Sequence, residues 1–256
     1  MTAAPGSASV VCPGLLSEAE SGRLLDSYGI PVAPWRQAAS ADEAVGAAQQ
    51  LGYPVVVKAV YPGLAHKSDV GGVEVDLRTA DEVREAVGRI SSHLAPYLAG
   101  QDLSFLVQTM VRGGLEIIAG GRRDPQFGPV VMCGLGGIYT EVLADVVFLL
   151  APCQEGDVRR ALRDLRGASL LGEVRGRPRR DVRALADVLV RLGRLLVECP
   201  EVEAVDVNPL MVLAEGQGCL AVDALVELSP CGQRNAGAAG QWWVRGQGWR
   251  SMGRCG

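Results

Sequence analysis

The chain has 256 residues, of which 48% are hydrophobic and 21% are charged, and its formal net charge is −4. This length supports one large domain or two small ones around a buried core, and the composition excludes disorder of the bulk of the chain. No apolar run approaches the roughly 20 residues that cross a bilayer, no signal peptide precedes the body, and the acidic balance gives no electrostatic case for nucleic acid. Seven scattered cysteines without metal-ligand spacing fit a reducing compartment. We therefore expect a cytoplasmic protein with neither membrane nor nucleic acid as a partner.

The first half of the chain carries strong local signals for helices. Ser17 with Glu20 and Thr79 with Glu82 have the spacing of capping boxes, in which each side chain satisfies a backbone N–H at the start of a helix. Further periodic segments alternate with these helices. They predict a helix at 41–51 and strands at 32–36, 55–59 and 73–77.

The second half is richer in strands. The hydrophobic pattern and the turn residues predict strands at 105–110, 115–120, 129–133, 203–207 and 219–224, and helices at 155–166 and 181–198. Short, hairpin-like connections favour a mixed α+β fold over a strictly alternating parallel sheet. The structured body is expected to span 15–228. Residues 229–256 are rich in Gly, Trp and Arg and are expected to be disordered.

Lysine is rare in this chain, because Lys58 and Lys67 are the only lysines among 25 basic residues. Lys58 lies within the apolar run Val-Val-Val-Lys-Ala-Val, and a buried amine is costly unless an anion receives it. One interpretation is a salt bridge with a nearby glutamate. The other is a lysine that projects from a sheet onto a nucleotide phosphate, where a compact ammonium differs from an arginine fork.

Three further motifs are candidates for chemistry. The loop Gly134-Leu-Gly-Gly137 follows a strand and is suited to bring backbone N–H groups close to an anion, although it lacks the pattern of a P-loop. Asn208 and Asp223 are oxygen ligands that a turn could bring together around Mg²⁺; turn initiation and strand capping are the alternatives. His66, beside Lys67 and Asp69, is either a solvated loop residue or a carrier of a phosphoryl group.

Taken in order, these motifs resemble one family. YGIP, YPVVVKAV, HKSDVGGV, RRDPQFGPVVMCGLGG, LLGEVRGRP and VDVNPLMV are similar to the ATP-grasp subunit of the NDP-forming acyl-CoA synthetases, the ADP-forming acetate–CoA ligases related to the succinyl-CoA synthetase β subunit. The resemblance implies an ATP-grasp fold, in which two α+β lobes hold the nucleotide between them, with a lid lobe at about 31–108.

The resemblance also implies roles for particular residues. Lys58 would bind phosphate, and Glu116 would face the nucleotide and the metal. Backbone groups of the hinge strand would contact adenine; the residues concerned are Gln108, Met110 and Val111. Asn208 and Asp223 would hold Mg²⁺. His66 would relay a phosphoryl group, and Glu141 would contact the phosphohistidine loop of a partner subunit.

The expected activity is that of an ADP-forming acid–thiol ligase, which uses ATP or ADP with Mg²⁺ and acts on an acid or its CoA thioester. The chain has no CoA-binding half, so the resemblance implies a hetero-oligomer with a CoA-binding α subunit. The alternatives are a non-catalytic or regulatory ATP-grasp module of a protein acetyltransferase-type assembly and a carboxylate–amine ligase, which would not need His66. The chain departs from the family pattern at Thr109, where an acid is usual, and at Leu225, where an arginine is usual.

Overall fold

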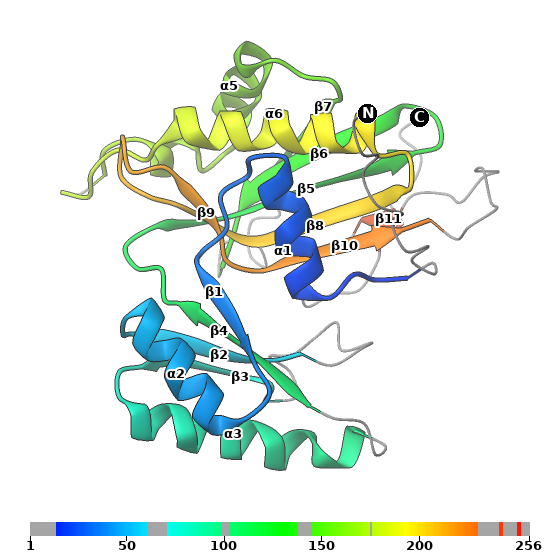
Figure 1. The fold of residues 1–256 in the computed structure, drawn as a ribbon. Helices are drawn as coiled ribbons and strands as arrows, with labels where there is room; N and C mark the ends of the chain where they lie inside the picture. Colours follow the sequence, from blue (N-terminus) through cyan, green and yellow to red (C-terminus); the bar gives the residue numbers. More distant parts are fainter. Residues whose placement is uncertain are drawn as a thin grey trace, which may run out of the picture.

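A computed structural model describes residues 14–60, 71–98, 103–137, 145–174 and 176–229, together with the pairs 241–242 and 250–251. Within these residues the chain forms two lobes, each built on its own antiparallel sheet (Figure 1). The predicted mixed α+β fold is confirmed, because every pairing between neighbouring named strands is antiparallel.

The smaller lobe contains a four-stranded sheet in the order β1-β4-β2-β3. Its strands are β1 (Trp35–Ala38), β2 (Val55–Val60), β3 (Val73–Leu77) and β4 (Ser104–Thr109). Two helices, α2 (Ala41–Leu51) and α3 (Ala80–Leu94), cover one face of this sheet, and the short 3-10 helix η1 (Ala95–Tyr97) follows α3 (Figure 1). Apolar residues from that face and from both helices form a core of their own.

The larger lobe contains a sheet in the order β10-β8-β5-β6-β7, with β9 also paired to β8. Its strands are β5 (Leu115–Asp124), β6 (Gly128–Leu135), β7 (Val146–Leu150), β8 (Val202–Val212), β9 (Cys219–Ala221) and β10 (Ala224–Leu228). Its other elements are α1 (Glu18–Ser27), α5 (Glu155–Asp164), the 3-10 helix η2 (Ala168–Leu171) and α6 (Val182–Glu198).

Helix α6 covers the face of the large sheet that points away from the smaller lobe (Figure 1). Its apolar stripe at helical spacing, which includes Leu185, Leu189, Leu192 and Leu196, is fully buried in the core of this lobe. Burying one leucine side chain of this kind stabilises the fold by about 1.5–3 kcal/mol. The sheet is therefore fixed on its upper face, and its lower face is left to meet the smaller lobe.

The capped helices form as the sequence predicts. The Ser17 hydroxyl oxygen accepts a hydrogen bond from the N–H of Glu20. The N–H of Ser17 in turn donates to the Glu20 carboxylate, which completes the capping box of α1. Thr79 caps α3 through the N–H of Glu82, while the Glu82 carboxylate accepts from the N–H of Arg78 instead of Thr79. Both helix starts are thus specified by side chains three or four positions apart in sequence.

Several elements of the structure differ from the prediction in their bounds or division. The strand expected at 32–36 lies at 35–38, and the short apolar run that forms β7 is absent from the prediction. The strand expected at 203–207 continues to 212, because the proline of Asn208–Pro209 sits at a bulge, where a strand tolerates the missing N–H. The expected strand 219–224 is divided into β9 and β10.

Most of the tail 229–256, which was expected to be disordered, lies outside the described residues. Where it is described, the backbone forms a short antiparallel pair, β11 (Gln241–Trp242) with β12 (Arg250–Ser251). The expected disorder of the tail stays a prediction. Within the described part of the chain, no helix combines the length and apolar composition that a membrane crossing requires.

Candidate functional site

The two sheets turn their uncovered faces toward each other. Along β2 the side chains of Val55 and Val57 enter the core under α2 and α3, so the alternating residue Lys58 lies on the opposite face. The same alternation along β4 buries Val107 with the helices and places Gln108 on the face of Lys58. Lys58 and Gln108 therefore point from the smaller lobe toward the larger one.

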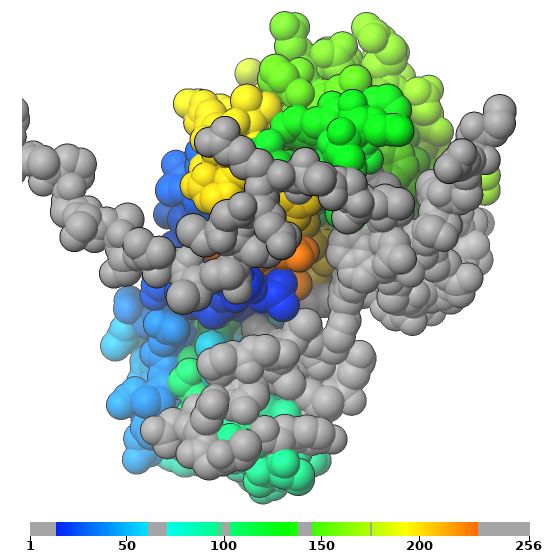
Figure 2. Space-filling model, turned by 90° about the vertical axis from the view of Figure 1, so that its right-hand side faces the viewer, coloured from blue at the N-terminus to red at the C-terminus, as the bar shows by residue number. Residues whose placement is uncertain are grey.

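Lys58 is 4% exposed and forms two hydrogen bonds to the larger lobe. Its Nζ donates to Oε1 of Glu18 at 2.6 Å and to the carbonyl of Val222 at 2.8 Å. Glu18 begins α1, and the N-terminal residues, dark blue in Figure 2, lie between the two lobes. Of the two interpretations of Lys58, the structure shows the ion pair with a glutamate. Among the described residues, two of its three ammonium donors are used in this way.

Gln108 is 1% exposed, and its Nε2 donates to the carbonyl of Ala33 at 3.4 Å. Its Oε1 is buried and has no donor among the described residues. Gln108 also lines a small cavity between the lobes, of about 10 Å³, together with Glu18, Val222 and Asp223. A buried acceptor without a donor is costly, so Oε1 is available to an N–H or O–H donor, although the cavity itself has room for about one water molecule.

On the larger lobe, a β-bulge presents the predicted metal ligands. Val207 pairs with Ala119 and Leu210 with Ile117, so β8 carries one residue more than β5 between these pairs. The extra residue falls at Asn208–Pro209, and it lets both Val207 and Leu210 remain in the core.

Asn208 lies directly opposite Asp223, because its N–H donates to the Asp223 carbonyl at 3.0 Å. Directly opposed residues in an antiparallel pair carry their side chains on the same face, about 5 Å apart. The backbone thus places these two oxygen-bearing residues side by side, and their role as metal ligands stays a prediction. Asn208 does not end its strand as expected, however, but lies within β8, and Asp223 lies between β9 and β10.

Glu116 lies on the same lower face of the large sheet, on β5 opposite Met211 of β8. Its backbone carbonyl accepts the N–H of Gly136 at 2.8 Å, and a Cβ built on Gly137 would stand 2.7 Å from its Oε2. The glycine loop is therefore packed against Glu116. The Gly136 N–H, which was expected to be open to an anion, is already used within the protein.

Some backbone groups of the hinge between the lobes form hydrogen bonds within the fold. Strand β4 is paired on both edges, so the backbone of Gln108 is engaged in the sheet, and the N–H of Met110 donates to the carbonyl of Pro54 at 3.1 Å. The N–H of Met110 is therefore used within the fold, and the backbone contact to adenine expected at this hinge stays a prediction. Val111 follows, half-buried, at the start of the connection to β5.

Two residues of the site come from positions that the sequence prediction did not single out. Glu18 lies inside the helix start predicted from Ser17 and Glu20, and nothing in its spacing connects it to Lys58. Arg180 is buried and donates to the carbonyl of Gly113 at 2.7 Å, which ties the larger lobe to the hinge. One sequence feature could have indicated that Glu18 and Arg180 are buried, because each is a charged residue beside an apolar segment. His66 and Glu141 lie outside the described residues.

The structure also bears on two other kinds of chemistry, a metal centre made of protein ligands alone and reactive thiols. Among the described residues, no three His, Cys, Asp or Glu side chains gather in a way that could hold a metal ion alone. Burial raises the pKa of the Cys133 and Cys219 thiols to about 12, so neither is a thiolate at neutral pH. Leu225, where the family pattern usually has an arginine, lies on β10 opposite Asp206 of β8.

Comparison with known proteins agrees with this geometry. A family model described as ATP-grasp domain matches residues 13–228. The chain is 40% identical to the β subunit of acetate–CoA ligase (ADP-forming) I from Pyrococcus furiosus, over 82% of this chain and 90% of that subunit. It is 39% identical to the 4-hydroxybutyrate–CoA ligase (ADP-forming) of Nitrosopumilus maritimus, over 84% of this chain but 31% of that longer protein.

Solved structures of the Ca. Korarchaeum cryptofilum dinucleotide-forming acetyl-coenzyme A synthetase 1 have the same fold. One, in complex with coenzyme A, Ca-AMPCP and HgCl⁺, is 40% identical with a TM-score of 0.80, covering 84% of this chain and 94% of that one. Another contains coenzyme A and Mg-AMPPCP, with a phosphohistidine segment that points towards the nucleotide-binding site; it is 40% identical with a TM-score of 0.73, covering 84% and 93%.

Two lobes that face each other across a lysine and a pair of oxygen ligands define an ATP-grasp protein. The chain belongs to the ATP-grasp domain family, as the domain of an ADP-forming acyl-CoA synthetase of the acetate–CoA ligase β-subunit type.

Proposed function

We propose that this chain is the nucleotide-binding subunit of an ADP-forming acyl-CoA synthetase, which converts acyl-CoA, ADP and phosphate into acid, ATP and CoA. The observation that carries the proposal is the meeting of Lys58, from one lobe, with the segment that holds Asp223 and Asn208 on the other. A cation and two hard oxygen ligands across one cleft are what the phosphates of a nucleotide and their metal need.

The side chains present fit a magnesium nucleotide. Mg²⁺ is commonly held by one or two protein oxygens, with phosphates and water completing its shell, and Asn208 with Asp223 supplies such a pair. Bound there, Mg²⁺ would supply positive charge next to the phosphates. We assign Lys58 the neutralisation of a phosphate, and Gln108 an interaction with a donor of the nucleotide through its buried Oε1.

The phosphoryl group reaches this site from a partner. In the proposed sequence, a CoA-binding α subunit forms an acyl phosphate from acyl-CoA and phosphate, and a histidine accepts the phosphoryl group as the acid leaves. His66 then receives it and passes it to the terminal phosphate oxygen of ADP. Glu116 and Glu141 are assigned to the two ends of this transfer, at the nucleotide and at the partner's phosphohistidine segment. We assign the complex to the cytoplasm, in keeping with the free cysteines of the described residues.

Reconstitution tests this function. The full chain is mixed with a CoA-binding α subunit of an ADP-forming synthetase, and ATP formation from acetyl-CoA, ADP and phosphate is followed. ATP should form with both subunits and Mg²⁺ present, and neither subunit should form it alone. Nucleotide binding without ATP formation in the mixture would contradict the proposal and identify a non-catalytic module instead.

A further inference from the structure

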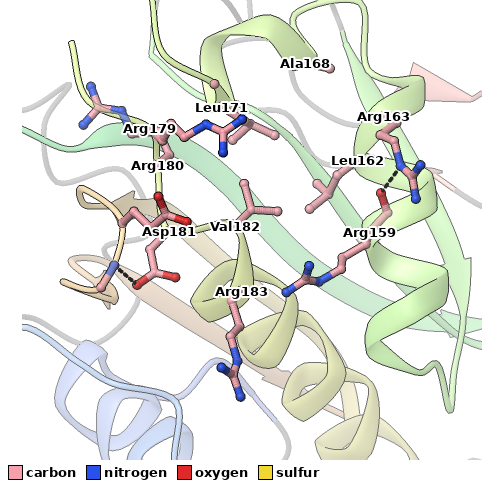
Figure 3. A pocket seen from close by; sticks show the side chains of 13 residues that line it. Arg159, Leu162, Arg163, Ala168, Leu171, Arg179, Arg180, Asp181, Val182 and Arg183 are labelled. Carbon is pink, nitrogen blue, oxygen red and sulfur yellow. Dashed lines mark hydrogen bonds between the residues drawn. The ribbon is translucent and has the colours of Figure 1, made fainter.

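A second cavity lies on the larger lobe, away from the facing sheets. It measures about 590 Å³ and is enclosed by α5, the segment that leads into α6, and the turn at 215–216 (Figure 3). Its floor is apolar, because Leu162 of α5, Leu171 of η2 and Val182 at the start of α6 line it. Leu162 and Leu171 are 2% and 6% exposed, so this is a built concavity and not an open stretch of surface.

The lining carries an excess of positive charge. Five arginines line the cavity against two acids; the arginines are Arg159, Arg163, Arg179, Arg180 and Arg183, and the acids are Asp181 and Glu215. They come from two walls, since the first two belong to α5 and the others precede or begin α6. Figure 3 shows Arg159 extending from α5 toward the first turn of α6. A concave site lined by one sign of charge focuses its field and attracts counter-ions.

The two acids of the lining offset only part of this charge, since five arginines face them. Asp181 is consumed by the fold, because its carboxylate accepts the backbone N–H groups of Ala184, Gly216 and Gly218 at 3.0 Å each. Burial alone would raise the pKa of Asp181, but these three donors outweigh it and hold the pKa below its usual value. Arg159 pairs with Glu155 at 2.8 Å, and this exposed pair is open to competition by a stronger anion.

The geometry points to a second ligand site, which takes a small molecule that carries a diphosphate. A diphosphate is a multiply charged anion with several acceptor oxygens, which suits the net positive charge of this lining. Planar guanidinium groups bind phosphate oxygens in pairs, and the apolar floor can hold the remainder of the molecule. The site is separate from the cleft of Lys58 and does not depend on the function proposed above.

Its position connects it to the hinge. Arg180 lines the cavity and also donates to the carbonyl of Gly113, in the connection between the lobes. Arg180 is 8% exposed and structural, so the exposed arginines are the ones to remove in a test.

The test is calorimetric titration of the full chain with inorganic pyrophosphate, without Mg²⁺ and at low salt. The variant is Arg159→Ala/Arg183→Ala, which removes one exposed guanidinium from each wall. The control is Arg194→Ala, an exposed arginine of α6 that pairs with Glu198 at 2.7 Å and does not line the cavity. Wild type should bind pyrophosphate, the double variant at least tenfold more weakly, and the control within twofold of wild type.

Titrations of wild type and of the double variant with ADP and with CoA identify the source of the diphosphate. Because ADP also binds in the proposed nucleotide cleft, the source is the ligand whose affinity falls in the double variant. Thermal unfolding confirms that the variants are folded, and Arg183→Ala alone replaces the double variant if that unfolds. Pyrophosphate binding in the double variant within twofold of wild type would overturn the site, as would the absence of pyrophosphate binding in wild type. Either failure leaves ATP formation by the reconstituted complex unaffected, so it is distinguishable from failure of the proposed function.

Discussion

Removing the charge of Lys58 separates its role in the fold from its role in the reaction. The side chains of Lys58 and Glu18 are 5% and 6% exposed, and their charged atoms are 2.6 Å apart. At an effective dielectric constant of about 20, their gross attraction is about 6 kcal/mol. The loss of one partner leaves the other charge buried, which costs about 3–5 kcal/mol of folding free energy.

Three variants form the cycle: Lys58→Met, Glu18→Gln, and both together. Each single change should lower the melting temperature by about 10 °C, from the usual relation for a chain of this size. The double variant should lose no more stability than either single one, because it leaves no unpaired charge. The measurements are thermal unfolding and denaturant titration of each variant.

ATP formation with the α subunit should not follow this recovery. The double variant regains stability but lacks the cation that faces the phosphates, so its activity should stay at least a hundredfold below wild type, as for the loss of a single group that stabilises transferring charge. Recovery of activity together with stability would refute the assignment of Lys58 to the phosphates. Stability losses that simply add in the double variant would refute the ion pair.

Three other changes test particular contacts. Asp223→Ala should raise the Mg²⁺ concentration needed for half-maximal ATP formation at least tenfold with little change in the melting temperature, and an unchanged requirement would remove this residue from the metal site. Gly137→Ala adds a Cβ 2.7 Å from Oε2 of Glu116 at a φ of +62°, whereas Gly128→Ala adds one in open space at +75°; both should lose about 1–2 kcal/mol, but only the first should lower ATP formation as well. Because the folded pKa of Asp181 is depressed, its stabilisation is present above the ordinary pKa of 3.8 and is lost as the pH falls through the lower folded value, so Asp181→Asn should be less stable than wild type at pH 7 and equal to it in acid unfolding near pH 2.

Much of the secondary structure was predictable from local sequence patterns. The predicted helix at 41–51 and strand at 73–77 match α2 and β3 to the residue, and both capped helices begin where their capping residues indicate. Capping and periodicity act between residues a few positions apart, so one sequence suffices to detect them. Strand β7 was missed because a five-residue apolar run at a sheet edge has no period that separates it from a buried helix segment.

The candidate site was predictable by residue type but not by contact. Lysine in an apolar strand indicated an anion, yet the choice between a glutamate and a phosphate depended on Glu18, which lies 40 positions away in sequence. The pairing of Asn208 with Asp223 followed from a short turn between strands, but the bulge that aims them depends on the register of β5. The N–H of Met110, one of the hinge groups, donates to the carbonyl of Pro54, a contact that no local pattern specifies.

His66, which we propose relays the phosphoryl group, offers the most direct test of the proposed function. The full chain is incubated with ATP labelled on the γ-phosphate and with Mg²⁺, and acid-labile, base-stable label on the protein is measured for wild type and for His66→Ala. The account predicts phosphohistidine in wild type and its loss in His66→Ala, with the melting temperatures of the two proteins equal. Equal labelling of both proteins, or none in wild type while ADP and Mg²⁺ still bind, would contradict it.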